Sequence, residues 1–258
     1  MVPKRTIGST GIEVSAIGLG TVKIGRNQGV KYPEAFDLPS DDAVVALFEL
    51  ARELGINLID TAPAYGVSEE RVGQLLPGPR EDWVLSTKLG EEFENGESFF
   101  DFSADHAKRS IERSLERLRT DRLDVVLIHS DGNDVANLEC PGLLDVLASY
   151  KSEGVIRSYG LSSKSVQGGV RAIELGCDLV MTMYNPWYTD EREVLEVAEQ
   201  QGASVFIKKA FASGHFGKGQ GDPVAQALNY ILERPSVASV ILGTINPGHL
   251  RQNCEAVF

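Results

Sequence analysis

Short apolar runs recur along the chain, and amphipathic segments separate them. Strands are predicted over residues 15–20, 57–60, 83–88, 123–129, 155–162, 178–184, 204–210 and 238–243. Most of these runs are continuous rather than alternating, which is typical of parallel strands that are covered on both faces. The pattern therefore indicates strands that alternate with helices around a buried parallel sheet.

The segments between the strands have helical periodicity. Residues 40–54 open with Ser40, a favourable N-cap, and two acidic residues follow in the first turn. Residues 190–202 end at Gly202, a residue type that often terminates helices. Residues 103–119 place four apolar side chains on one stripe, namely Ala107, Ile111, Leu115 and Leu118.

Eight strand–helix units, each of about 30 residues, predict a (β/α)8 barrel of the TIM type that spans residues 1–258 as a single domain. The alternative is a doubly wound open sheet. It is disfavoured because no G-x-G-x-x-G follows a strand: "GLGTVKIG" lacks the spacing, and we expect no helix directly after it. The segment "KRTIGSTGIEVSAIG" predicts an N-terminal β-hairpin that turns at residues 9–11 and lies at the bottom of the barrel.

Composition narrows the function. The net charge is −12, so the basic surface that nucleic acids and anionic membranes require is not expected, although a local cluster could still bind a small anionic cofactor. The three cysteines form no CxxC pair. The first residues lack the apolar core of a signal peptide, and no apolar run reaches the roughly 18 residues that span a bilayer. We expect a cytoplasmic protein; the sequence indicates nothing about its oligomeric state.

Four chemically capable side chains follow successive predicted strands: Asp60, Tyr65, Lys88 and His129. In such barrels the chemistry takes place at the C-terminal ends of the strands. Each residue alone has an ordinary structural interpretation, as a cap, turn packing, a solvated lysine or a structural histidine. Together, at matching depth on adjacent strands, they favour a catalytic site.

The set makes chemical sense as a proton-transfer site. Asp60 would hold Lys88 charged, because an acid that closes a buried strand needs a cationic partner. The ammonium is expected to lower the pKa of Tyr65 from its reference value of about 10. His129 could orient a carbonyl oxygen or relay a proton, and a nicotinamide would supply the missing hydride. No metal site is expected, because the four histidines are dispersed, at positions 106, 129, 215 and 249.

These motifs resemble those of the aldo-keto reductases over nearly the whole chain. The resemblance lies in "GLGTVKIG", "NLIDTAPAYGVSEERVGQLL", "VLSTKLG", "HAKRSIERSLERLRTDRLDVVLIH", "YGLSS" and "VILGTINPGHLRQN". It implies the same barrel and an NAD(P)H-dependent oxidoreductase that reduces the carbonyl of a small aldehyde, ketone or sugar. It also implies a tetrad in which Tyr65 is the general acid, Lys88 modulates its pKa, His129 orients the substrate and Asp60 pairs with Lys88.

The resemblance further implies the cofactor contacts. Gly20 and Thr21, with Asp60, match positions beside the nicotinamide ribose. Ser162 and Ser163 match the carboxamide site. Met181 stands where a glutamine is usual, and Lys208 where many members stack a tyrosine on the nicotinamide. Neighbouring side chains of a strand point to opposite faces, so either Lys208 or Lys209 faces the cofactor near its pyrophosphate. Phe211 lies in the same segment. The adenosine end is assigned to Gly243, Thr244, His249, Gln252 and Asn253.

NADP(H) is expected over NAD(H), although NADP-selective members often carry lysine and arginine where Gly243 and His249 stand. One alternative is a cofactor-binding regulatory module with little turnover, which would not need the complete tetrad. Another is an isomerase or lyase with a Schiff-base lysine, which is disfavoured because Lys88 is expected to pair with Asp60.

An aromatic wall is expected to line the substrate pocket. Its side chains are Phe93, Phe99, Phe100, Phe102, Trp187 and Tyr188.

Overall fold

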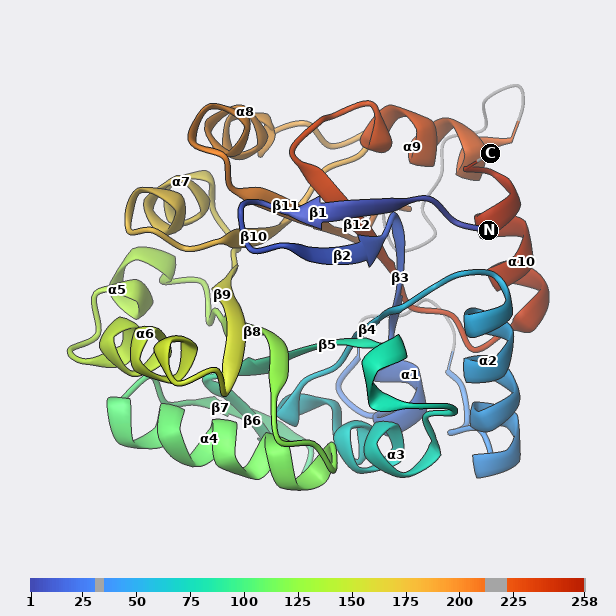
Figure 1. The fold of residues 1–258 in the computed structure, drawn as a ribbon, viewed down its shortest axis with the longest axis horizontal. Coiled ribbons are helices and arrows are strands. Elements are labelled where there is room, and N and C mark those ends of the chain that lie inside the picture. The colour runs from blue at the N-terminus through green and yellow to red at the C-terminus, as the bar shows by residue number, and fades with distance from the viewer. Residues whose placement is uncertain (31–34, 212–221, 258) are drawn as a thin grey trace.

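Eight parallel strands close into a barrel in the computed structural model, which describes residues 1–30, 35–211 and 222–257 (Figure 1). Strand β12 pairs with β3 and so completes the ring. The predicted (β/α)8 barrel is confirmed, and each predicted strand corresponds to one observed strand. These are β3 (Ile17–Gly20), β4 (Leu58–Asp60), β5 (Val84–Leu89), β8 (Leu123–His129), β9 (Ile156–Ser162), β10 (Leu179–Met183), β11 (Ser204–Lys208) and β12 (Val237–Leu242).

Helices surround the barrel (Figure 1). Ser40 and Ser103 cap the helices that follow them, and Gly202 ends another helix in the left-handed region. Within the described residues, none of the helices is long and apolar enough to cross a membrane. The helices are α2 (Asp41–Glu53), α3 (Ser68–Leu75), α4 (Ala104–Arg117), α5 (Asp134–Leu138), α6 (Leu143–Ser152), α7 (Val166–Glu174), α8 (Arg192–Gln201), α9 (Pro223–Leu232) and α10 (Pro247–Glu255), with single 3₁₀ turns η1 (Pro63–Tyr65) and η2 (Arg80–Asp82).

A one-turn helix, α1 (Val22–Gly25), directly follows β3. The expectation that no helix begins there was wrong. The turn packs against the loop after β4, and Gly25 makes this approach possible. A Cβ atom at Gly25 would lie 2.2 Å from the Tyr65 carbonyl oxygen and 2.3 Å from the Ser68 nitrogen. The short helix therefore fixes the position of the loop that carries Tyr65.

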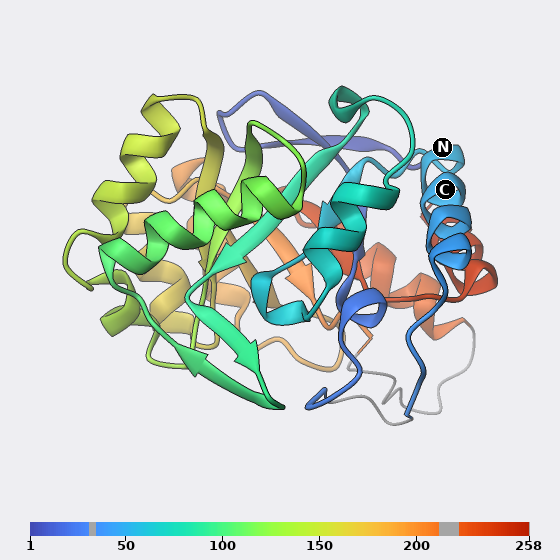
Figure 2. The same ribbon diagram turned by 90° about the horizontal axis from the view of Figure 1, so that it is seen from below.

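Two hairpins lie at opposite ends of the barrel (Figure 2). The predicted N-terminal hairpin, β1 (Lys4–Ile7) and β2 (Ile12–Ser15), is confirmed. Its side chains Ile7 and Ile12 pack against Leu58 inside the barrel, so it closes the bottom. The second hairpin, β6 (Glu91–Glu94) and β7 (Glu97–Phe100), lies at the mouth. It occupies a segment in which no strand was predicted from the sequence.

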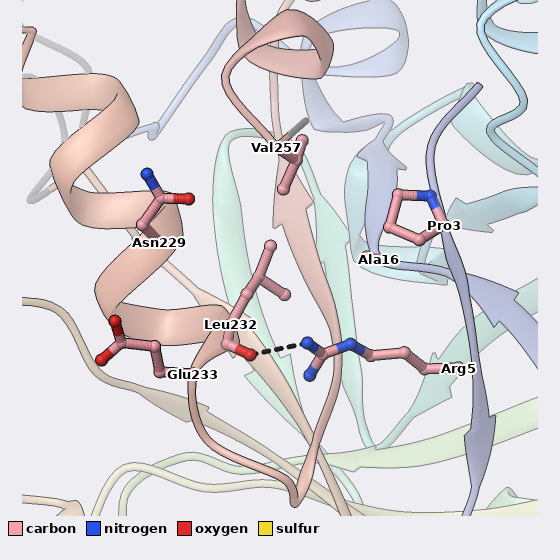
Figure 3. A pocket seen from close by; sticks show the side chains of 7 residues that line it. All are labelled: Pro3, Arg5, Ala16, Asn229, Leu232, Glu233 and Val257. Atoms are coloured by element: carbon pink, nitrogen blue, oxygen red, sulfur yellow. Dashed lines mark hydrogen bonds between the residues drawn. The ribbon is translucent and has the colours of Figure 1, made fainter.

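A shallow pocket lies at the bottom of the barrel, between the N-terminal hairpin and α9 (Figure 3). Arg5 in its lining has a structural role, because it donates to the Leu232 carbonyl at 2.6 Å and to the Val237 carbonyl at 2.7 Å. This arginine ties β1 to the chain between α9 and β12. The lining residues are Pro3, Arg5, Ala16, Asn229, Leu232, Glu233 and Val257.

The contact at Gly25 gives a first prediction. Gly25→Ala should lower the free energy of unfolding by about 3 kcal/mol or more, because the new methyl meets backbone atoms that cannot rotate away. The control is Gly154→Ala, where a Cβ meets nothing within 4 Å and only the left-handed φ of 78° costs about 1 kcal/mol. Urea unfolding measures both variants. Equal losses would contradict the tight contact between α1 and the Tyr65 loop.

Candidate active site

A buried ion pair forms the base of the site. Lys88 Nζ lies 2.9 and 2.8 Å from the two carboxylate oxygens of Asp60 and donates to the Thr61 carbonyl at 2.8 Å. The two side chains are 1 and 4% exposed. Burial by itself lowers the pKa of Lys88, but the adjacent Asp60 carboxylate and Tyr65 together outweigh it, and the net pKa is raised. Lys88 is therefore a fixed ammonium, as the sequence analysis expected.

Buried hydroxyl groups hold this ion pair in place. Ser86 donates to Asp60 Oδ1 at 3.0 Å. Thr61 donates to the Ser68 hydroxyl at 2.9 Å, which lies 2.7 Å from the Thr21 hydroxyl, and Thr21 donates to the Asp60 carbonyl at 2.9 Å. The first residue of α3 is thus tied to the ends of β3 and β4. The sequence analysis did not single out Thr61 or Ser68, although both lie within the "DTAPAYGVSEE" motif.

Tyr65 lies beside both Lys88 and His129. Lys88 Nζ is 4.9 Å from the centroid of the Tyr65 ring. The His129 ring meets the tyrosine edge-on, with centroids 6.1 Å apart and planes at 85°. Burial raises the pKa of Tyr65 above its reference value, and the opposing effect of the Lys88 ammonium is smaller. The ammonium acts to lower this pKa, as expected, but burial outweighs it, and Tyr65 is a protonated phenol at neutral pH.

His129 contacts a carboxylate that the sequence analysis missed. Its Nδ1 lies 2.9 Å from Oε2 of Glu91, the first residue of β6. Burial lowers the pKa of His129, and the nearby Glu91 carboxylate only partly offsets this. Burial acts to raise the pKa of Glu91, but His129, Ser98 and Arg26 outweigh it and lower the value to about 2. Glu91 is therefore an anion.

Lys208 points into the mouth, and Lys209 does not. Lys208 Nζ donates to the Ser162 hydroxyl at 3.0 Å and to the Ser163 carbonyl at 2.6 Å. Lys209 is exposed and turns the chain with a φ of 53°. Within the part of the chain that the structure describes, Lys208 has no carboxylate at ion-pair distance. Burial lowers the pKa of Lys208 to about 8, although Glu191 acts in the opposite direction.

Several predicted cofactor residues are held by the protein itself. The amide and hydroxyl groups of Ser163 both donate to the Met181 carbonyl, at 3.0 and 3.4 Å. The Met181 side chain is 2% exposed and packs against Phe206 inside the barrel. The Thr21 hydroxyl is buried on the Asp60 carbonyl. These side chains lie beneath the mouth, and Gly20 ends β3 beside them.

The predicted adenosine end is largely exposed. Gly243, His249 and Gln252 are exposed, Thr244 is half-buried and Asn253 is buried. Asn246 caps α10, because its Oδ1 accepts from the Gly248 amide at 2.8 Å and the His249 amide at 3.2 Å. These two amides are therefore already occupied.

The remaining predicted contacts vary in their surroundings. Phe211 is partly buried against the main core. Residues 212–214 of the same segment, and His215, lie outside the described residues. Of the predicted aromatic wall, Phe99, Phe100 and Trp187 are exposed and Phe93 lies beneath the guanidinium of Arg26.

The mouth therefore holds a phenol, a paired ammonium, a histidine beside a carboxylate and a second ammonium. Such a set can transfer a proton to or from an oxygen and can stabilise the charge that develops there. No group of three or more His, Cys, Asp or Glu side chains among the described residues is arranged to hold a metal ion.

Comparison with known proteins points to one family. The model of the aldo/keto reductase family matches residues 16–226. A solved structure assigned to the aldo-keto reductases of Pseudomonas aeruginosa is 49% identical, with a TM-score of 0.88, and the match covers 98% of this chain and 94% of that one. The NADH-specific methylglyoxal reductase of Escherichia coli is 30% identical over 82% of this chain and 68% of its own length. A D-threo-aldose 1-dehydrogenase of a Pseudomonas species is 25% identical over 96% of this chain and 90% of its own length.

The buried ion pair gives a second prediction. Asp60→Asn should reduce the free energy of unfolding by about 3–5 kcal/mol, because Lys88 would remain a buried ammonium without its counter-ion. Lys88→Met is the second single variant. The double variant, with both Asp60→Asn and Lys88→Met, should lose less stability than the sum of the two single losses. The control is Asp82→Asn, which breaks an exposed ion pair of 2.9 Å with Arg52 and should cost at most about 1 kcal/mol. Urea unfolding at neutral pH measures all four variants, and additive losses would show that Asp60 and Lys88 are not coupled.

Proposed function

Because the chain belongs to the aldo/keto reductase family, we propose that it reduces the carbonyl of a small aldehyde, ketone or sugar at the mouth of its barrel, with Tyr65 as general acid. At the coarser level, the chain is an NAD(P)-dependent oxidoreductase, as its family and its relatives show. The observation that carries the proposal is a protonated Tyr65 beside an ammonium that Asp60 keeps charged.

The residues have distinct roles in the proposed reaction. A nicotinamide bound at the mouth would supply the hydride for the carbonyl carbon. Tyr65 donates its phenolic proton to the carbonyl oxygen, and the phenolate that remains is stabilised by Lys88. Asp60 fixes the position of Lys88 through two short contacts, so that little reorganisation is needed when the charge appears. His129, whose ring meets the Tyr65 ring edge-on, orients the oxygen.

The chemistry of the mouth fits an anionic dinucleotide. Lys208 and Ser162 place an ammonium and a hydroxyl where the nicotinamide end would lie. The exposed Lys209 adds positive charge beside the end of β11, where the pyrophosphate would pass. Gly20 and Gly243 leave room for the cofactor, because neither carries a side chain. The exposed His249 and Gln252 of α10 are available to the adenosine end.

Cofactor preference is part of the proposal. We expect NADP(H) to bind better than NAD(H), as in the family, but by a small margin. The Gly248 and His249 amides already bind Asn246, so a 2′-phosphate would gain little from the start of α10. The Escherichia coli relative is described as NADH-specific, which shows that similar sequences can differ in this respect.

A third prediction tests Tyr65. Tyr65→Phe should lower kcat for carbonyl reduction by about 10²–10⁴-fold, because the general acid is lost, while NADPH affinity changes little. Tyr150→Phe is the control, since that hydroxyl donates to Glu112 on an outer helix. Turnover of an aldehyde panel and fluorescence titration with NADPH provide the two readouts. Near-normal turnover in Tyr65→Phe would contradict its role. Saturable NADPH binding by the unaltered chain without turnover on any carbonyl would favour a regulatory binding module instead.

A fourth prediction tests the adenosine end. His249→Arg should tighten NADPH by about tenfold and leave NADH nearly unchanged, because a guanidinium can pair with the 2′-phosphate. His249→Gln is the control for loss of the imidazole alone. Fluorescence titration with each cofactor gives the dissociation constants. Equal changes for NADPH and NADH in His249→Arg would show that position 249 does not face the 2′-phosphate.

A further inference from the structure

The carboxylate of Glu91 is anchored against His129 by the hairpin at the mouth. Its Oε2 lies 2.9 Å from His129 Nδ1. Its Oε1 accepts from the Ser98 hydroxyl at 2.7 Å, across the β6–β7 pair, and lies 3.9 Å from the guanidinium of Arg26. The side chains of Glu91 and His129 are only 14 and 16% exposed. Each carboxylate oxygen therefore has its own partner, and Oε2 is directed to the histidine.

This contact decides which imidazole nitrogen carries the proton. An unprotonated Nδ1 carries partial negative charge and would lie 2.9 Å from an anionic oxygen, so the two atoms would repel each other. Nδ1 is therefore protonated in both charge states of the ring. The N–H is not aligned well enough for a regular hydrogen bond, so charge attraction supplies most of the interaction.

The fixed proton on Nδ1 leaves Nε2 with two possible states. In the neutral ring Nε2 has a lone pair and can only accept a hydrogen bond; in the imidazolium it can donate one. We propose that Glu91 is a positioning residue that fixes His129 in the Nδ1–H form, so that Nε2 accepts from an alcohol hydroxyl when the ring is neutral and donates to a carbonyl oxygen when the ring is protonated. The catalytic half of this statement rests on the proposed function.

The charge state of His129 then links pH to the direction of the reaction. Four titratable groups face the ring: Glu91 from β6, Lys88 from β5, Lys208 from β11 and Tyr65 from η1. Burial and the two ammonium groups favour the neutral ring, whereas Glu91 favours the cation. Reduction should weaken as pH rises through the His129 transition, while alcohol oxidation gains. Relatives of this chain are described as enzymes of both directions, a reductase and a dehydrogenase.

The first experiment reads the tautomer without cofactor or turnover. Nitrogen NMR of the full chain, with His129 identified by its absence in His129→Gln, distinguishes protonated from unprotonated ring nitrogens over a pH series. We expect Nδ1 to be protonated above and below the transition, and only Nε2 to titrate. A neutral ring protonated on Nε2 would overturn the proposal. Because this readout needs no catalysis, it is independent of whether the chain reduces carbonyls.

The second experiment removes the charge and keeps the shape. In Glu91→Gln the His129 transition should move down by about one pH unit or more, and carbonyl reduction near neutral pH should fall about tenfold or more. Alcohol oxidation and NADPH affinity should change much less. Glu94→Gln is the control, because that carboxylate is exposed on the same strand. An unchanged transition in Glu91→Gln would overturn the proposal. A shifted transition with unchanged direction of reaction would uphold the tautomer control and overturn the catalytic half.

Discussion

The ion pair between Lys88 and Asp60 is the constraint on which the mouth of the barrel depends. Two charges buried this deeply are tolerated only when they meet each other and when further polar groups bind their remaining hydrogens and lone pairs. The surrounding structure meets this requirement: Ser86 binds the carboxylate, the Thr61 carbonyl binds the ammonium, and Thr21 holds the backbone of Asp60. These contacts join three neighbouring strand ends to the loop that carries Tyr65. The same contacts that stabilise the ion pair therefore position the phenol.

Burial and nearby charge act in opposite directions on the pKa values of Lys88, Lys208 and His129. The number of close contacts that each group makes decides whether its pKa is raised or lowered. Lys88 has both oxygens of a carboxylate within 2.9 Å, and its pKa is raised despite complete burial. Among the described residues Lys208 binds a hydroxyl and a carbonyl but no carboxylate, and burial lowers its pKa to about 8. His129 has one carboxylate oxygen in a poorly aligned contact, and burial prevails there too. The mouth thus combines one permanent cation with two groups whose charge depends on pH.

The sequence was sufficient for the barrel and for the meeting of the four tetrad residues. Continuous apolar runs predict parallel strands, and the strand-end rule then brings Asp60, Lys88 and His129 to one edge. It was insufficient for strands that lack an apolar run. It was also insufficient for pKa values, which depend on a balance between burial and nearby charge. The β6–β7 strands read "EEFE" and "ESFF", without an apolar run, although Asn95 and Gly96 form the two-residue turn with positive φ that their order indicates. Missing this hairpin meant missing Glu91. The strand-end positions indicate that Lys88 lies near Tyr65, but they do not show the depth of burial that raises the pKa of Tyr65.

The two ends of the proposed cofactor site differ in how they are built, and this difference bears on how the protein could change. At the chemical end the ion pair of Asp60 and Lys88 is buried and bonded to neighbouring hydroxyl and carbonyl groups, so one substitution there disturbs several neighbours. At the adenosine end the side chains of His249 and Gln252 are exposed, and Asn246 already satisfies two amides at the start of α10. Selection between NAD and NADP there would rest on surface side chains rather than on the backbone. Because exposed side chains couple weakly to the core, a substitution there should change cofactor preference without loss of the catalytic arrangement.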